Sequence, residues 1–314
     1  MQNSRKITFL NYILSIFVIY ILVNMILFPS FYLQTTLNGI TAWAFNVLPA
    51  ILPFIFFTKI LSLSGVVEKF SSFFSKPTKF LYNTSSLSSF AFVSSIISGY
   101  PVGAKITSDL YQNGKITRQD ACKMMSFCST SGPMFIIGAV GAGMLGSVTA
   151  GYLIFIAHIL GALINGIIYR KIKSKEIGNE NHNFQNFKSN NLSSIVLDSA
   201  LSVISVGAII AIFFVVITSL SPLLSMFSPA TSSFLGGIIE ITKGCLDISA
   251  LSNLPLKVIL STFIISFGGI STLFQCASLT NSFKPPIGLL ILQKLTHAIF
   301  STIIIFIILF IFPL

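Results

Sequence analysis

The chain's 314 residues are 54% hydrophobic and only 9% charged, and their mean hydropathy is +0.89. A water-soluble domain carries about 25% charged residues, so this composition excludes a soluble fold and places most of the chain in a lipid bilayer. The net charge of +11 comes from short basic clusters between apolar runs. Clusters of this kind set membrane topology and give no support for nucleic acid as a partner.

Apolar segments of membrane-spanning length begin near the N-terminus. The run 7–28 follows two basic residues, but it is about twice as long as a signal-peptide core and has no small-residue cleavage site, so it predicts a first membrane helix. Six more segments approach the roughly 20 residues that one crossing needs: 38–62, 124–146, 149–169, 195–220, 258–281 and 286–312. The sequence therefore predicts an all-α polytopic membrane protein with about seven transmembrane helices.

Two further apolar segments are broken in the middle. Glycines and a proline interrupt residues 86–104, and glycines with two charged residues interrupt residues 231–253. If both are re-entrant hairpins and the N-terminus is cytoplasmic, all 19 Lys and Arg residues except Lys243 and Lys257 lie inside, as the positive-inside rule requires. Lys294 is counted among these cytoplasmic charges. The same arrangement places the C-terminus outside.

The order of segments predicts an internal repeat. Residues 170–192 form an extended hydrophilic stretch that predicts a cytoplasmic linker. Each flanking half contains a crossing, a broken segment, a glycine-interrupted crossing and a crossing with a histidine, and the halves start from opposite sides of the membrane. We therefore predict two inverted repeats, 38–169 and 193–314, with 1–37 as an extra N-terminal helix.

The first candidate site is the interruption at 98–105. Irregular backbone at membrane depth is tolerated where it is enclosed by protein or lines a water-filled cavity, so this run predicts a hairpin tip beside a cavity. Its free amides and its lysine favour an anionic ligand. The alternative is a surface loop whose lysine only sets topology. The predicted substrate-binding residues are Ser98, Gly99, Tyr100, Pro101, Gly103 and Lys105.

The second candidate is an interrupted helix in each half. Pro133 follows three hydroxyl residues within 124–146, a pattern typical of a helix broken at mid-membrane so that backbone groups face a ligand. Glycines and hydroxyl residues stand at the corresponding place in 258–281. The alternative is a kink with close helix packing on small residues. The predicted binding residues are Ser129, Thr130, Ser131, Gly132, Gly268, Gly269, Ser271 and Gln275.

The third candidate is a carboxylate in the second broken segment. An ionisable side chain within a membrane segment is costly and indicates function. We predict that Glu240 binds a coupling cation or proton, while Thr242, Lys243 and Gly244 contact the substrate. The alternative is an internal ion pair between Glu240 and Lys243 that only fixes the hairpin.

The remaining polar residues give no enzyme or cofactor signature. The sequence contains no nucleophile elbow, P-loop, metalloprotease motif or paired carboxylates. The four cysteines form no C-x-x-C pair and the three histidines are far apart in sequence. We therefore expect no enzyme activity, no cofactor and no metal. His158 and His297, one in each half, are either proton relays or packed hydrogen-bonding residues.

Several motifs, in this order, resemble a known family. They are S-G-Y-P-V-G-A-K at 98–105, F-C-S-T-S-G-P-M-F-I-I-G-A-V-G at 127–141, His158, E-I-T-K-G at 240–244 and F-G-G-I-S at 267–271. The chain resembles the YlbJ-type sporulation integral membrane proteins of the nucleoside-recognition (Gate) family, whose fold is similar to the inverted-repeat core of concentrative nucleoside transporters. This resemblance implies movement of dipicolinic acid, a small dianionic aromatic, from the mother cell into the forespore.

Together these observations predict a secondary or facilitative transporter for a small anionic solute. The alternatives are a non-transporting assembly or scaffold protein of the spore envelope, and a transporter of nucleosides or related small molecules. The expected partners are the small-molecule substrate, a coupling cation or proton and the lipid bilayer, and a homo-oligomer is compatible with the sequence. The expected location is the bacterial cell membrane or the forespore membrane.

Overall fold

The computed structural model describes residues 2–63, 66–173 and 192–312. Regular structure in these residues is entirely helical, which confirms the predicted all-α class. The elements before residue 125 are α1 (Gln2–Leu27), α2 (Pro29–Ala42), the π-helix η1 (Trp43–Val47), α3 (Leu48–Leu63), α4 (Val66–Phe73), α5 (Ser75–Tyr82), α6 (Ser88–Ser98), α7 (Val102–Gln112) and α8 (Arg118–Met124).

The remaining elements begin with the π-helix η2 (Met134–Met144). They continue with α9 (Val148–Ile168), the short 3₁₀ helix η3 (Tyr169–Lys171), α10 (Leu192–Leu224), α11 (Pro229–Ile239), α12 (Ile241–Ser249), α13 (Leu254–Phe267), α14 (Gly269–Leu279) and α15 (Ile287–Ile311). Most of the predicted linker 170–192 lies outside the described residues.

Four stretches of the described chain are long and apolar enough to cross a membrane. They are Val148–Lys171, Leu192–Leu224, Leu254–Leu279 and Ile287–Ile311, and each corresponds to a predicted crossing. A fifth candidate is the bent pair Asn11–Leu27 and Pro29–Phe45. The multi-pass membrane architecture is thus supported, with four or five candidate spans where the sequence predicts about seven.

Backbone interruptions explain the smaller number. The chain bends by 110° between 11–27 and 29–45, where Pro29 opens α2 and has no amide hydrogen to continue the preceding helix. The predicted crossing 38–62 is helical throughout, and the π-helical turn η1 within it shifts the hydrogen-bond register of the helix. The predicted crossing 124–146 is non-helical at 128–132.

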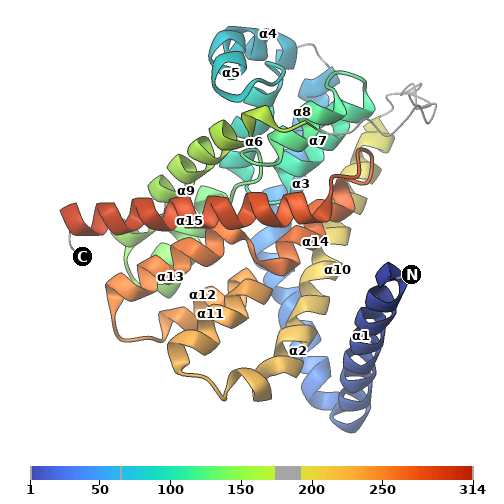
Figure 1. Cartoon of the computed structure of the whole chain (residues 1–314), viewed down its shortest axis with the longest axis vertical. Helices are drawn as coiled ribbons and strands as arrows, with labels where there is room; N and C mark the ends of the chain where they lie inside the picture. The colour runs from blue at the N-terminus through green and yellow to red at the C-terminus, as the bar shows by residue number, and fades with distance from the viewer. Residues whose placement is uncertain (1, 64–65, 174–191, 313–314) are drawn as a thin grey trace.

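Helix packing brings the two halves of the chain together. α15 packs against α9 and α13, and α10 packs along α2 and α3 (Figure 1). At the α9–α15 contact, a Cβ on Gly161 would lie 2.9 Å from the amide nitrogen of Ser301, so the two backbones approach closely on small residues. α6 with α7, and α11 with α12, form two helix–break–helix pairs. Their re-entrant course and their inverted relation stay predictions.

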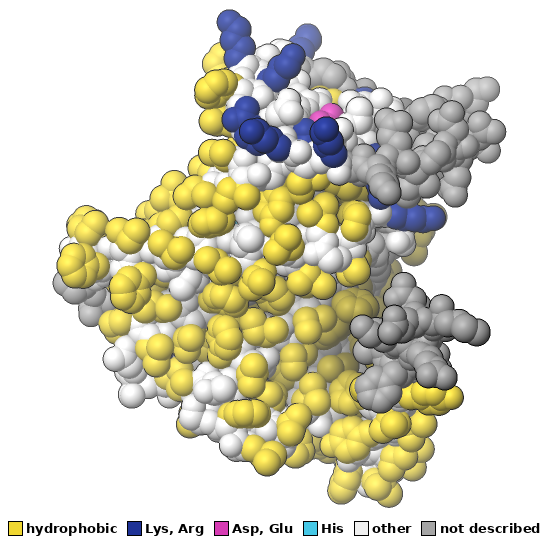
Figure 2. Space-filling model, viewed as in Figure 1, with side chains coloured by type: hydrophobic (Ala, Val, Ile, Leu, Met, Phe, Trp, Pro, Cys, Tyr) yellow, Lys and Arg dark blue, Asp and Glu magenta, His cyan; other side chains and the backbone are white. Residues whose placement is uncertain are grey.

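Basic side chains gather at one end of the molecule. Figure 2 shows Lys and Arg over the elements that Figure 1 labels α4 and α5, above a largely hydrophobic face. Segments predicted to be cytoplasmic contact one another: Arg118 Nε donates to the Phe283 carbonyl (2.8 Å), and Gln119 Nε2 donates to the Ile172 carbonyl (2.9 Å). These contacts agree with a shared cytoplasmic side, and the orientation of the chain in the membrane stays a prediction.

Candidate functional site

Two breaks in the first half meet through their glycines. α6 ends at Ser98 and α7 begins at Val102. Between them Gly99 has φ +83°, a value that glycine adopts without the Cβ clash of other residues. A Cβ on Gly99 would lie 2.6 Å from the amide nitrogen of Gly132, which belongs to the second break. The two interrupted backbones are therefore in direct contact.

Side chains of other helices hold the break at 128–132. The amide of Thr130 donates to Ser95 Oγ (3.0 Å), and the amide of Ser131 donates to His158 Nε2 (2.8 Å). Unpaired backbone groups at membrane depth cost several kcal/mol each. These side chains therefore stabilise the unwound segment by accepting backbone amides that an uninterrupted helix would bond within itself.

A buried ammonium lies at the same break. The Lys294 side chain, on α15, is buried, and its residue is only 4% exposed. Its Nζ donates to the carbonyl of Ser129 and to the Tyr100 hydroxyl (3.0 Å), and it lies 4.1 Å from the centroid of the Tyr100 ring. Within the described part of the chain, the ion pairs involve other lysines. The Lys294 charge is thus held by neutral groups alone.

The burial of Lys294 was not expected from the sequence analysis, which counts this residue among the cytoplasmic charges. The physical reason is that α15 carries it into contact with two backbone breaks, a relation between residues far apart in sequence. A local signal was present: Gln293, Lys294 and His297 stand together in a mainly apolar helix, and all three are buried. Ionisable residues inside membrane helices indicate functional sites.

The second half has a buried carboxylate at its first break. Glu240 is 1% exposed and separates α11 from α12 with extended backbone (φ −139°, ψ 118°). Its Oε2 accepts the backbone amide of Lys243 (2.8 Å), so Glu240 caps α12. The Lys243 ammonium pairs with Asp247. The contact between Glu240 and Lys243 is thus made through the backbone, and the lysine charge has a partner of its own.

The second break of this half meets the first one. Gly268 (φ +84°) ends α13, and Gly269 (φ +71°) starts α14. A Cβ on Gly269 would lie 3.3 Å from the Ile239 carbonyl oxygen and 3.3 Å from the Ile241 amide nitrogen. The second half therefore repeats the arrangement of the first, in which two interrupted backbones touch.

Tyr100 and His158 connect the halves. The Tyr100 hydroxyl is 3.3 Å from the Ile265 carbonyl oxygen and 3.4 Å from that of Ser266. A Cβ on Gly268 would lie 3.4 Å from Tyr100 Cζ. His158 Nδ1 lies 2.8 Å from Ser266 Oγ. The breaks at 99–101, 128–132, 240 and 268 thus converge, and we call this group the break cluster.

Lys105 does not turn towards the break cluster. Its ammonium lies 3.2 Å from Asp109 and 3.4 Å from Asp198, and Lys59 also pairs with Asp198. Asp109, and the Asp198 carboxylate that it shares with Lys59, already lie against this lysine, so its predicted role as the countercharge of a ligand gains no support from the geometry.

The other predicted binding residues contribute to packing around the cluster. Gly103 faces the Cys128 carbonyl, and Gly244 faces the Gly237 backbone, both so closely that a Cβ would overlap the facing backbone. Three further predicted residues lie within helices: Thr242 in α12, and the mutually hydrogen-bonded Ser271 and Gln275 in α14.

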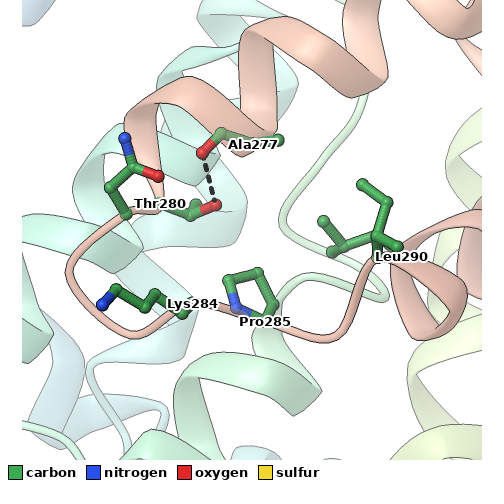
Figure 3. A pocket seen from close by; sticks show the side chains of 7 residues that line it. Ala277, Thr280, Lys284, Pro285 and Leu290 are labelled. Carbon is green, nitrogen blue, oxygen red and sulfur yellow. Dashed lines mark hydrogen bonds between the residues drawn. The ribbon is translucent and has the colours of Figure 1, made fainter. Parts of the chain in front are cut away.

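A small cavity lies beside the connection between α14 and α15. Its volume is about 160 Å³. Figure 3 shows Lys284 of the connecting loop and Ala277 and Leu290 of the flanking helices around it. Its lining residues belong to the loop between α14 and α15 and to the adjoining helix ends, and none of them belongs to the break cluster.

Comparisons with known proteins agree with these features. Residues 44–148, which contain both breaks of the first half, match the Gate family model, described as nucleoside recognition. The chain is 26% identical over 344 aligned positions to the sporulation integral membrane protein YlbJ of Bacillus subtilis (strain 168), covering 95% of this chain and 83% of that protein. No solved structure matches the chain. The resemblance indicated by the motifs is therefore confirmed: residues 44–148 match the Gate family model, and the chain is similar over nearly its whole length to a sporulation integral membrane protein.

Proposed function

We propose that the chain transports a small organic anion across the membrane and binds it at the break cluster. The observation that carries this proposal is Lys294, a buried ammonium beside two helix breaks that no described carboxylate balances. An ionised side chain at membrane depth is retained for function. An anionic ligand supplies the missing negative charge.

The convergence of backbone breaks supports transport over simple binding. Transporters built from repeats bind their substrates between discontinuous helices near the membrane midplane, where alternating movements of the repeats expose the site to either side. The buried hydroxyl of Ser98, at the tip between α6 and α7, has no hydrogen-bond partner among the described residues. It is a donor placed for a ligand beside the contact between Gly99 and Gly132.

Dipicolinate is the substrate that we favour. It is a small aromatic dianion, so the Lys294 ammonium can pair with one carboxylate while the ring packs against Tyr100. The match to a sporulation membrane protein supports the biological setting. Nucleosides are the second candidate, because the Gate model is described as nucleoside recognition. The sequence has no ATPase motif, so we assign the driving force to an ion gradient or to downhill flux.

A ligand screen by thermal shift tests the proposed function. The detergent-purified protein should melt at a higher temperature with dipicolinate, because a ligand that binds only the folded state stabilises it, by about 2.7 kcal/mol at one hundred times its Kd. Benzoate, a monoanionic aromatic, should shift it less. A shift with nucleosides and none with dipicolinate would transfer the assignment to the second candidate. No shift with any ligand class would favour a scaffold protein.

Glu240 is our candidate for binding the coupling cation or proton. Its carboxylate is buried in the break cluster, and its backbone contact with Lys243 survives replacement by glutamine, whose amide oxygen accepts the same bond. We therefore expect Glu240→Gln to abolish the dependence of uptake on an imposed ion or pH gradient and to leave ligand binding measurable. The matched control is Asp247→Asn on the same helix, which should keep that dependence. Gradient-driven uptake by Glu240→Gln at the wild-type rate would contradict this role.

A further inference from the structure

One imidazole ring is shared by breaks of both halves. His158, in α9, is fully buried. Its Nε2 accepts the amide of Ser131, within the break at 128–132, at 2.8 Å. Its Nδ1 lies 2.8 Å from the hydroxyl of Ser266, two residues before the break at Gly268. A single side chain therefore ties the first half of the break cluster to the second.

These contacts determine where the ring carries its proton. A backbone amide can only donate, so Nε2 must be unprotonated to accept from Ser131. The proton of the neutral ring is then on Nδ1, from which it is donated to the Ser266 hydroxyl. A doubly protonated ring carries hydrogens on both nitrogens and has no lone pair for Ser131. The arrangement seen here therefore requires a neutral His158.

The neighbours of His158 add to this requirement. The His297 ring, on α15, is 4.7 Å away between centroids, and its Nε2 donates to the His158 carbonyl at 2.9 Å. Lys294 precedes His297 by three residues on the same face of α15. A second proton on His158 would thus face a cationic group, and the two serines that hold the ring carry no negative charge to balance it. A proton added to His297 would leave its Nε2–H bond intact, so the two histidines are not equivalent.

We propose that His158 is a proton-operated clamp on the break cluster. The neutral ring holds Ser131 and Ser266 together, and protonation removes the Ser131 bond and releases the segment 128–132. His158 is a positioning residue in this proposal, since it acts on the ligand site through the backbone of the break. The inference rests on the proposed function, which makes the break cluster a ligand site. Release of the clamp at acid pH would open this site to ligand exchange.

Alkylation of Cys128 measures this release without any substrate. Cys128 is fully buried at the start of the break, and replacing Cys122, Cys245 and Cys276 by alanine leaves it as the single thiol. The labelling rate with N-ethylmaleimide, divided by the rate of the same protein unfolded in detergent at each pH, corrects for thiol ionisation. Between about pH 8 and pH 5.5 we expect the corrected rate to rise about tenfold, because the closed arrangement excludes the second proton while the released ring takes it up near the ordinary imidazole pKa of about 6.5, one unit above the lower limit.

Two variants separate the clamp from general acid sensitivity. His158→Gln keeps an acceptor for Ser131 that takes up no proton, so its corrected rate should stay low and constant across the pH range. His297→Gln should respond to pH as the single-cysteine parent does. A rate in the parent that does not change with pH, or an equal response in His158→Gln, would overturn the proposal.

A third variant keeps the test decisive if His158→Gln does not fold. Ser266→Ala removes the Nδ1 partner, so the corrected rate at pH 8 should already exceed that of the parent. An unchanged rate there would count against the clamp. Because these rates need no ligand, failure of the clamp and failure of transport are distinguishable: uptake with pH-independent labelling rejects only the clamp, and pH-dependent labelling without uptake rejects only transport.

Discussion

We expect Lys294→Met to abolish uptake of the anion without lowering the melting temperature of the protein. Methionine keeps most of the length of the side chain, lacks its terminal nitrogen and removes its charge. Loss of a buried, hydrogen-bonded charge contact to a ligand costs about 2–5 kcal/mol, which is roughly a 30-fold to several-thousand-fold loss of affinity. The variant relieves the folded protein of an ammonium that neutral groups alone hold, and it also removes the donor to the Ser129 carbonyl. We expect the relief of the buried charge to offset this lost hydrogen bond.

The comparison with a second lysine makes this result specific. Lys284 is exposed in the loop before α15, and Lys284→Met removes the same charge ten residues away. We expect this variant to keep both uptake and the melting-temperature shift with dipicolinate. If Lys294→Met transported at the wild-type rate, the ammonium would be a structural group and the anionic substrate class would lose its support. A large drop in melting temperature would also assign Lys294 to the fold.

Gly132→Leu should remove transport while the protein still inserts and is recovered at normal yield. A Cβ on Gly132 would lie 3.1 Å from the amide nitrogen of Gly99, so a leucine side chain must push apart the two breaks of the first half. Gly269→Leu should act in the same way in the second half, where φ is +71° and a side chain is strained in any case. We expect each variant to lose at least about tenfold in ligand affinity, because the bound geometry requires the touching backbones.

Gly138→Leu is the matched control for this pair. Gly138 lies six residues further along in η2, is exposed, and has no atom within 4 Å of an added Cβ. Uptake by this variant should equal that of the wild type. Uptake by Gly132→Leu and Gly269→Leu at the same level as Gly138→Leu would show that these glycines serve only helix packing. The measurement is initial uptake rate per reconstituted protein.

The sequence predicted the places where the helices break, because the signals are local. Glycine and proline are the residues that interrupt helices, and they can be read directly from the sequence. The breaks at Gly99, 128–132, Glu240 and Gly268 all fall within segments that the sequence analysis predicted to be interrupted. The all-α class followed from composition in the same way.

The partners of the charged residues could not be predicted, because they depend on contacts between distant parts of the chain. Lys105 and Asp198 meet across 93 positions of sequence, and Lys294 reaches Ser129 across 165. A count of basic residues for topology treats every lysine as a surface charge. It therefore counted Lys294 as a surface charge on the cytoplasmic side, although α15 buries this residue inside the protein.

Uptake by the purified wild-type protein tests the central claim most directly. Liposomes that contain the protein and trapped terbium ions would become luminescent when dipicolinate enters and binds the metal. We predict a saturable rise in luminescence that depends on the protein and that structurally similar dianions outside the liposomes reduce by competition. Protein-free liposomes and liposomes with Lys294→Met should show no rise. A wild-type signal no greater than that of protein-free liposomes, from protein that is folded and correctly inserted, would contradict the proposal that this chain transports a small organic anion.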